Sequence, residues 1–186
     1  MTETPADTPG GCLVTGCAGF VGSHLAEALL TAGAPVVGVD NFATGHPENM
    51  ERFRGNPEFT FLERDIRDPG LWDEVLQRLP GLAHVFHLAA VVSVAWSMDH
   101  EEETLETNYK TSIQLYNHAV NAGVRSFVFA GSAAEYGDEP RLPIKEEYAV
   151  EGAIQVSPYG RAKFLASRRI ENAGFGCSLR CFNIYG

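Results

Sequence analysis

Short apolar runs rich in β-branched residues alternate along this chain with longer segments of helical periodicity. The runs that predict strands are Cys12–Thr15, Pro35–Asp40, Phe59–Glu63, His84–Leu88, Ser126–Gly131 and Cys177–Phe182. The segments that predict helices are Val21–Ala32, Leu71–Arg78, Thr104–Ala122 and Pro158–Ala173, with Gly33 and Gly123 placed to end the first and third. This alternation predicts an α/β fold: a doubly wound parallel sheet, Rossmann-like, with helices on both faces.

Composition narrows the class of protein. The 186 residues, 45% hydrophobic and 20% charged, suit one globular domain. A net charge of −10 without a basic cluster argues against a nucleic-acid partner. No apolar run reaches the ~18 residues of a membrane span. Residues 1–10 are polar and acidic, unlike a signal peptide, so we expect a flexible leader followed by a dinucleotide-binding domain over residues 11–186.

Four cysteines raise the question of disulfides or a metal site. They lie at Cys12, Cys17, Cys177 and Cys181, with spacings that differ from CxxC and within apolar, strand-like stretches. We therefore expect buried free thiols in a reducing cytoplasm, and no metal.

A glycine-rich turn follows the first predicted strand. Gly16, Gly19 and Gly22 lead directly into a helix, whose N-terminal N–H groups attract phosphate. The alternative is a turn that uses glycine only for packing. Asp40 ends the next strand, where a carboxylate accepts hydrogen bonds from ribose hydroxyls and repels a 2′-phosphate, which favours NAD over NADP.

A tyrosine and a lysine lie four residues apart in the last predicted helix. Tyr159 and Lys163 therefore share one helical face. A neighbouring ammonium lowers the pKa of a phenol, which is otherwise near ~10. The pair predicts a group for proton transfer.

These motifs together resemble one family. The segment Thr15–Leu25 resembles the opening of the extended short-chain dehydrogenases/reductases, specifically the sugar-nucleotide epimerase/dehydratase group. The resemblance continues through Val39–Gly45, Asp65–Asp68, His87–Ala90, Asn108, Gly131–Gly137, Ser157–Lys163 and Leu179–Asn183. It implies NAD as cofactor, bound by Gly16, Gly19, Phe20, Val21, Gly22, Asp40, Asn41, Asp65, Ile66, Leu88, Ala89, Ala90, Asn108, Tyr159 and Lys163.

The resemblance also implies roles in catalysis. Ser132 would hydrogen-bond the reacting sugar oxygen, and Tyr159 would take the proton of a sugar hydroxyl as hydride leaves the same carbon. Lys163 would support Tyr159 and bond the nicotinamide ribose, while Asn108 would support the helix that carries the site. Substrate contacts are expected from Ser93, Ser132 and Asn183, although Ser93 suits a helix start equally well.

Residues after Ser132 discriminate between reactions. Dehydrating relatives carry Asp-Glu directly after this position, and decarboxylating ones a Glu two positions after it, whereas this chain has Ala133 and Ala134. The expectation is an NAD-dependent epimerase that oxidises sugar C4 transiently. The alternatives are a 4,6-dehydratase, decarboxylase or reductase of the same fold, or a non-catalytic NAD-binding module. We expect Glu135 to point to the other face of an extended segment, and His87 to be packed.

Three expectations concern partners and completeness. The substrate would be a UDP- or dTDP-sugar. The helices Thr104–Ala122 and Pro158–Ala173 would pair in a homodimer, through apolar residues that include Leu105, Ile113, Tyr116, Phe164 and Ile170. The resemblance continues in relatives into a C-terminal substrate lobe, which we expect to be absent from these 186 residues.

Overall fold

A computed structural model of the protein describes residues 10–149 and 156–186. The chain divides into two compact units. The first runs to Ala89 and adds Asn121–Phe127, and the second comprises Ala90–Val120 and Val128–Gly186. The leader expected at residues 1–10 lies outside the described residues, apart from Gly10.

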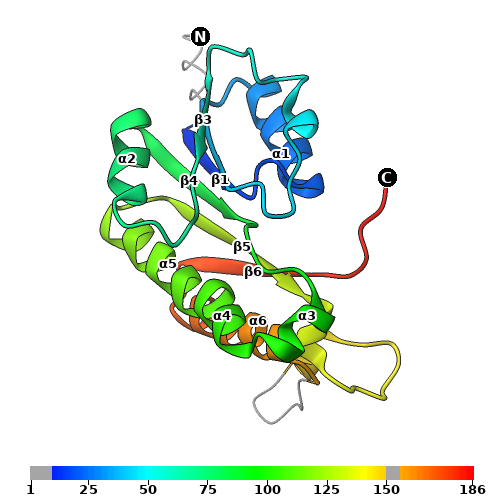
Figure 1. The fold of residues 1–186 in the computed structure, drawn as a ribbon. Helices are drawn as coiled ribbons and strands as arrows, with labels where there is room; N and C mark the ends of the chain where they lie inside the picture. Colours follow the sequence, from blue (N-terminus) through cyan, green and yellow to red (C-terminus); the bar gives the residue numbers. More distant parts are fainter. Residues whose placement is uncertain (1–9, 150–155) are drawn as a thin grey trace, which may run out of the picture. The chain divides into compact units, whose positions relative to one another are not determined.

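The first unit is built on a parallel sheet. Its strands are β1 (Gly11–Thr15), β2 (Val36–Asp40), β3 (Phe59–Glu63) and β4 (Leu82–His87), in the order β3-β2-β1-β4 (Figure 1). Leu13 pairs in register with Val37 on one side and Val85 on the other. Every residue of β1 and β2 is buried, as expected for central strands that are covered on both faces.

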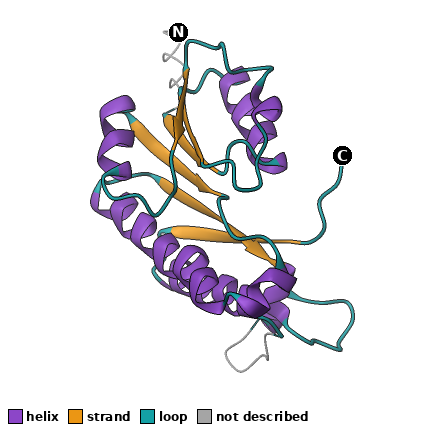
Figure 2. Cartoon of the chain, in the orientation of Figure 1, coloured by secondary structure: helices purple, strands orange, loops and turns teal. Residues whose placement is uncertain are grey.

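Two helices connect these strands. Helix α1 (Phe20–Thr31) joins β1 to β2, and α2 (Leu71–Arg78) joins β3 to β4. They lie on opposite sides of the strands of this unit (Figure 2), because right-handed crossovers running in opposite directions along a sheet place their helices on opposite faces. Gly33, in the left-handed region with φ 83°, follows the end of α1 as predicted.

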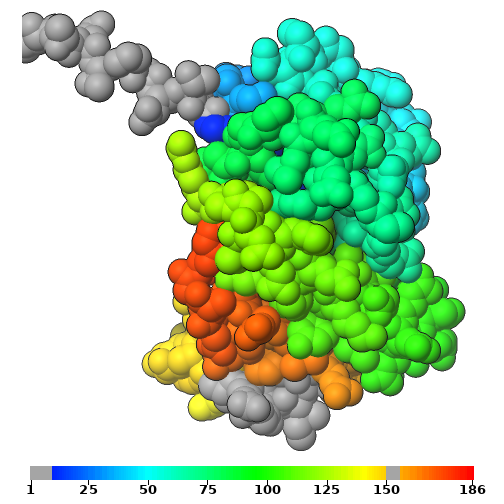
Figure 3. All heavy atoms as spheres, turned by 90° about the vertical axis from the view of Figure 1, so that its left-hand side faces the viewer, coloured from blue at the N-terminus to red at the C-terminus, as the bar shows by residue number. Residues whose placement is uncertain are grey.

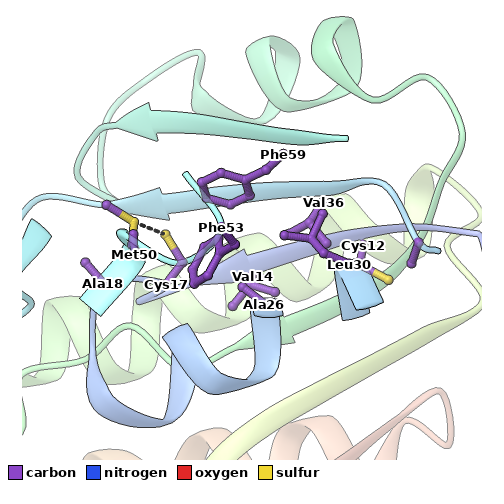
Figure 4. Close-up of a cluster of buried hydrophobic side chains, with 11 residues drawn as sticks. Cys12, Val14, Cys17, Ala18, Ala26, Leu30, Val36, Met50, Phe53 and Phe59 are labelled. Carbon is purple, nitrogen blue, oxygen red and sulfur yellow. Dashed lines mark hydrogen bonds between the residues drawn. The ribbon is translucent and has the colours of Figure 1, made fainter. Parts of the chain in front are cut away.

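A hydrophobic core on the α1 side supports the glycine turn (Figure 4). Cys12 and Val14 point into it from alternate positions of β1, and Ala26 and Leu30 of α1 cover them. The core extends to the short 3₁₀-helix η1 (Pro47–Met50), where the Met50 sulfur lies 3.8 Å from the Cys17 thiol. The turn thus rests on packed side chains.

The second unit begins with helices. They are α3 (Val94–Asp99), α4 (Glu101–Leu105), the π-helix η2 (Glu106–Thr111) and α5 (Ser112–Asn121). The single helix predicted over Thr104–Ala122 is therefore interrupted by wide π-turns, and α3 was not predicted. Asn108 lies in the π-helix, where its amide donates to the Val91 carbonyl and accepts from the Val91 N–H, both at 2.8 Å.

The remainder of the second unit surrounds one long helix. Strand β5 (Ser126–Ser132), which starts in the first unit, leads into the 3₁₀-helix η3 (Ala133–Tyr136) and later η4 (Glu146–Tyr148). Helix α6 (Pro158–Asn172) then precedes β6 (Gly176–Cys181), which neighbours β5. On the face shown in Figure 3, the orange-red segment around β6 lies beside α5, where the rings of Tyr116 and Phe175 are 5.7 Å apart.

Most predicted elements are confirmed, with bounds that match for β3 and α2 and differ by one or two residues for the other strands. Two expectations about side chains need correction. Tyr116, Phe164 and Ile170, named as dimer residues, are buried within the chain, because its own helices and strands already cover them. Cys177 is exposed, because alternation along β6 turns Cys177 and Leu179 outward, and Cys181 is only half-buried. Cys12 and Cys17 are buried as expected.

The four cysteines are free thiols. Within residues 10–149 and 156–186, no three His, Cys, Asp or Glu side chains are grouped as a metal site would require. The helices of the described part are all too short or too polar to span a bilayer.

Candidate cofactor and proton-transfer sites

The glycine turn is tight because backbone atoms meet there. The Gly16 N–H donates to the Val39 carbonyl at 2.7 Å, and Gly16 adopts φ 74°. A Cβ on Gly16 would lie 2.8 Å from the Ala89 nitrogen, and one on Gly22 would collide with the Gly16 carbonyl oxygen. Packing alone therefore demands glycine at both positions, whatever ligand the turn holds.

The start of α1 is open for an anion. Its N-cap is Gly19, which supplies no side-chain hydrogen bond to the first turn. Phe20 and Val21, the first helical residues, are 44% and 39% exposed. The N–H groups of a first helical turn have no partner within the helix, so this end of α1 fits a phosphate group.

Asp40 is engaged within its own unit. Its side chain is buried, with Oδ2 accepting from the Ala18 N–H at 2.9 Å and Oδ1 from the Phe42 N–H at 2.8 Å. Phe42 has φ 56°, a left-handed conformation unusual for a residue with a side chain. Each carboxylate oxygen keeps a second lone pair, so Asp40 can hold the turn and still accept from ribose hydroxyls.

Asn41 and Asp65 form a second polar group beyond β2 and β3. The Asn41 amide donates to Asp65 Oδ2 at 2.8 Å, and Arg67 pairs with the same carboxylate. The hydrogen bond from the Arg67 side chain is the main reason that the pKa of Asp65 falls to about 2. Ile66 beside it is half-buried, which suits one edge of a base-binding surface.

The predicted segment after β4 is held by Thr15. The Leu88 and Ala89 N–H groups each donate to Thr15 Oγ1 at 3.2 Å, and His87 Nδ1 lies 2.7 Å from the same oxygen. His87 is fully buried, so the expectation that it is packed is confirmed. Ala90, the last residue of the predicted segment Leu88–Ala90, is the first residue of the second unit. With its glycine cradle, open helix end and carboxylate, the first unit fits a dinucleotide.

Ser132 stands where β5 becomes η3. Its Oγ accepts from the Ala134 N–H at 3.1 Å, while its own N–H donates to Glu135 Oε1 at 2.8 Å. These two bonds make a capping box, so the direction of the serine side chain is set by the backbone around it. The Ser132 and Tyr159 side chains are hydrogen-bonded.

The expected lowering of the Tyr159 pKa by Lys163 stays a prediction. In the chain as described, burial raises the pKa of Tyr159, the hydrogen bond with Ser132 lowers it, and the charges of Glu135 and Cys181 raise it further. The Lys163 ammonium donates to the Ala130 carbonyl at 2.6 Å and lies 4.6 Å from the centre of the Phe129 ring. Its desolvation lowers the pKa of Lys163 to about 8.

The other predicted residues have mixed placements. Ser93 begins α3, accepting from the Trp96 N–H at 3.1 Å, which is the helix-start role left open above. Asn183 is exposed beyond β6.

Glu135 lies in a 3₁₀-turn and is fully buried, so the expected extended segment is wrong. Ser97 of α3, which is not among the predicted site residues, is a buried hydroxyl that accepts from the Tyr159 N–H at 3.3 Å.

The chain is similar to proteins of known family. The model of the NAD dependent epimerase/dehydratase family matches residues 12–186. The chain belongs to this family. The UDP-glucose 4-epimerase of Mycolicibacterium smegmatis is 37% identical over 152 residues, which are 81% of this chain and 47% of that protein. The chain thus spans about half the length of the curated relatives it matches.

Solved structures of the family agree. The UDP-glucose 4-epimerase of Thermotoga maritima, solved with UDP-glucose, has a TM-score of 0.83 at 32% identity over 95% of this chain and 56% of that one. The Bordetella bronchiseptica enzyme WbmG, solved with NAD, has a TM-score of 0.82 at 28% identity over 95% of this chain and 54% of that one. The predicted Rossmann-like fold class and NAD as the cofactor of the family are therefore confirmed.

Proposed function

We propose that this chain is the NAD-binding part of a nucleotide-sugar epimerase that oxidises sugar C4 transiently. The observation that carries the proposal is the arrangement of Ser132, Tyr159 and Lys163 in one unit of a chain from this family. The relatives named above as UDP-glucose 4-epimerases support a UDP-sugar as substrate, with a dTDP-sugar as the alternative.

The proposed chemistry needs one proton acceptor on the sugar. NAD, when bound, supplies the hydride acceptor and later returns the hydride, and its positive ring favours the phenolate of Tyr159. Tyr159 takes the proton of the C4 hydroxyl and gives it back after the keto sugar has turned over. Ser132, oriented by its capping box, bonds the same sugar oxygen and the phenol. Lys163 places a positive charge behind this group.

The same turn disfavours the rival reactions. Dehydration needs an acid and a base next to the sugar, and Ala133 and Ala134 supply neither. Glu135 is fully buried and bonded to Arg180 and Ser167, which removes it as a substitute. The side chains of this segment support proton transfer at one hydroxyl. This is enough for epimerisation but not for elimination of water.

The remaining site and partner assignments are part of the same proposal. In the first unit, Gly16–Gly22 and Asp40 would hold the pyrophosphate and ribose, with Asn41, Asp65, Ile66 and Leu88–Ala90 beside the base and cleft. In the second, Asn108 would support the site, and Ser93 and Asn183 would reach substrate. We place the protein in the cytoplasm as a homodimer, with the substrate lobe supplied outside these 186 residues. Free thiols support the location.

The test is turnover of a nucleotide-sugar panel by a form of this chain extended to the length of its curated relatives. Mass spectrometry and NMR of the products decide: unchanged mass with inverted C4 supports epimerisation, and loss of water or carbon dioxide supports a rival. Tyr159→Phe should lower turnover by ~10²–10⁴-fold, and a loss below about tenfold would assign the base elsewhere. NAD binding without any turnover would favour a non-catalytic module.

A further inference from the structure

Glu135 joins three elements of the second unit at one buried point. Its Oε1 accepts from the Ser132 N–H at the end of β5 and from Ser167 Oγ of α6, both at 2.8 Å. Its Oε2 forms an ion pair with Arg180 Nε of β6, also at 2.8 Å. The side chain is 0% exposed. A carboxylate in this position couples the serine turn to the helix beside it.

The helix that Glu135 contacts is the one that carries the proton-transfer pair. Tyr159, Lys163 and Ser167 follow one another at intervals of four residues, so they form one stripe along α6. Glu135 bonds the last member of this stripe and the backbone of Ser132, whose side chain bonds the first member. The position of Ser132 against Tyr159 therefore depends on Glu135 at both ends.

The charge of Glu135 also acts on the pair. Desolvation lowers the pKa of Lys163, and the negative charge of Glu135 is the main influence opposing it. The same charge raises the pKa of Tyr159, after the larger effects of burial and Ser132. The charged and titratable groups near it on the packed elements are Arg180 and Cys181 of β6, Tyr159, Lys163 and Glu171 of α6, and Tyr136 of η3.

Stability alone gives little reason for this network. A buried ion pair is often no more stabilising than apolar side chains of similar volume, because both charges lose their hydration. Arg180 already has Glu171 as a second partner, at 3.0 Å. Retaining a fully buried carboxylate between Ser132 and the Tyr159 stripe is better explained by geometry and charge at the site.

The geometry points to Glu135 as a positioning residue for proton transfer. It holds Ser132 and the Tyr159–Lys163 stripe of α6 in one arrangement and keeps a negative charge facing the buried ammonium. This role rests on the proposed epimerase function for its consequence in catalysis, whereas its physical content is measurable without turnover.

The test is NMR titration of the 186-residue chain with labelled lysine, which is clear because the sequence has only Lys110, Lys145 and Lys163. Glu135→Gln should lower the pKa of Lys163 by at least about half a unit and speed exchange of the Ser132 amide. Glu171→Gln is the matched control: it removes the negative charge of the other carboxylate that pairs with Arg180, and it should leave the pKa of Lys163 unchanged. Equal titration of Lys163 in the wild type and Glu135→Gln would overturn the proposal.

A second pair of variants covers the case in which Glu135→Gln does not fold. Ser167→Ala removes the hydroxyl that bonds Glu135, whereas Ser178→Ala removes only its neighbour, 2.7 Å from Ser167 Oγ. The Ser132 and Tyr159 resonances should move in Ser167→Ala and stay in Ser178→Ala. Identical spectra of the two variants at these residues would refute the coupling.

Activity then separates this proposal from the proposed function. In an active longer protein, Glu135→Gln should lower kcat at least about tenfold with little change in KM, and Glu135→Asp should restore part of it. An unchanged kcat would refute the positioning role in catalysis. The longer protein without substitutions could turn over no nucleotide sugar while the pKa of Lys163 in the 186-residue chain falls as expected in Glu135→Gln. In that case the epimerase function is refuted and the positioning by Glu135 stands.

Discussion

Asp40, which we propose binds the adenosine ribose, also supports the backbone around it. Its two oxygens hold the Ala18 and Phe42 amides, and the same oxygens would meet the adenosine ribose. A substitution that removes its charge therefore also removes a link that keeps Phe42 in its left-handed conformation. If Asp40 binds the ribose as proposed, a substitution that changes cofactor preference here also changes local stability.

The first prediction follows from that coupling. The chain should bind NAD at least about tenfold more tightly than NADP, because a 2′-phosphate would face a carboxylate. Asp40→Asn should narrow this ratio and lower the melting temperature at the same time. Calorimetry with both cofactors measures the ratio, and equal affinities in the unmodified protein would refute the assignment.

The second prediction concerns thiols. Cys177 is exposed, whereas Cys12 and Cys17 are buried, and burial raises the pKa of Cys12 to about 11. A thiolate-selective reagent at pH 8 should modify Cys177 rapidly, and Cys12 and Cys17 only on unfolding. Peptide mass spectrometry over time identifies the order. Cys177→Ser should abolish the fast phase, and a fast phase that survives would show that another thiol is open.

At the scale of elements, the glycine turn provides a matched pair of variants. Gly22→Ala places a methyl group against the Gly16 carbonyl, so we expect a loss of ~1–3 kcal/mol in unfolding free energy and weak NAD binding. Gly55→Ala meets nothing within 4 Å and should change stability by less than ~0.5 kcal/mol. Urea unfolding compares them, and equal losses in both would contradict the close packing of the turn.

Lys163 of helix α6 makes the free energy of unfolding depend on pH. Lys163 has a folded pKa of about 8 against an ordinary value of 10.5, so between pH 8 and 10.5 the unfolded chain binds more protons than the folded one. The contribution of Lys163 to stability therefore rises from pH 8 towards 10.5, on the order of 1–3 kcal/mol. Above pH 9, ionisation of the buried Cys12 and Cys17 thiols opposes folding, because burial raises their pKa.

Comparing the unfolding free energy of the wild type with that of Lys163→Met at each pH isolates the contribution of Lys163. The difference in unfolding free energy between the two proteins should shift in favour of the wild type from pH 8 upwards. A difference that stays constant between pH 7 and 10 would show that the ammonium is not desolvated.

These elements also show what the sequence could predict. The turn from Gly16 to Gly22 and the strand ending at Asp40 were predictable, because spacing within a few residues defines them. The orientation of Lys163 was not, since its partners Ala130 and Phe129 come from another element. Glu135 was misplaced for the same reason: its ion pair with Arg180 joins residues 45 positions apart. Burial, which sets both pKa directions in the pair, is a property of the packed unit.

At the scale of the molecule, the chain spans about half of its curated relatives. We predict that the 186-residue polypeptide binds NAD but turns over little or no nucleotide sugar alone. Calorimetry and product NMR on the same preparation test both parts. Robust turnover without added protein would overturn the prediction, and failure to bind NAD would contradict the first unit as a cofactor site.

The π-helix at Glu106–Thr111 has a consequence for comparing this chain with others. An α-helix advances about 100° per residue, so an insertion within it rotates everything that follows. A wide turn absorbs one extra residue and leaves the flanking turns facing as before. A relative with a regular helix here should therefore show a one-residue gap opposite Glu106–Thr111, and an alignment forced through without the gap would misplace every side chain from Asn108 to the end of α5 on the wrong face.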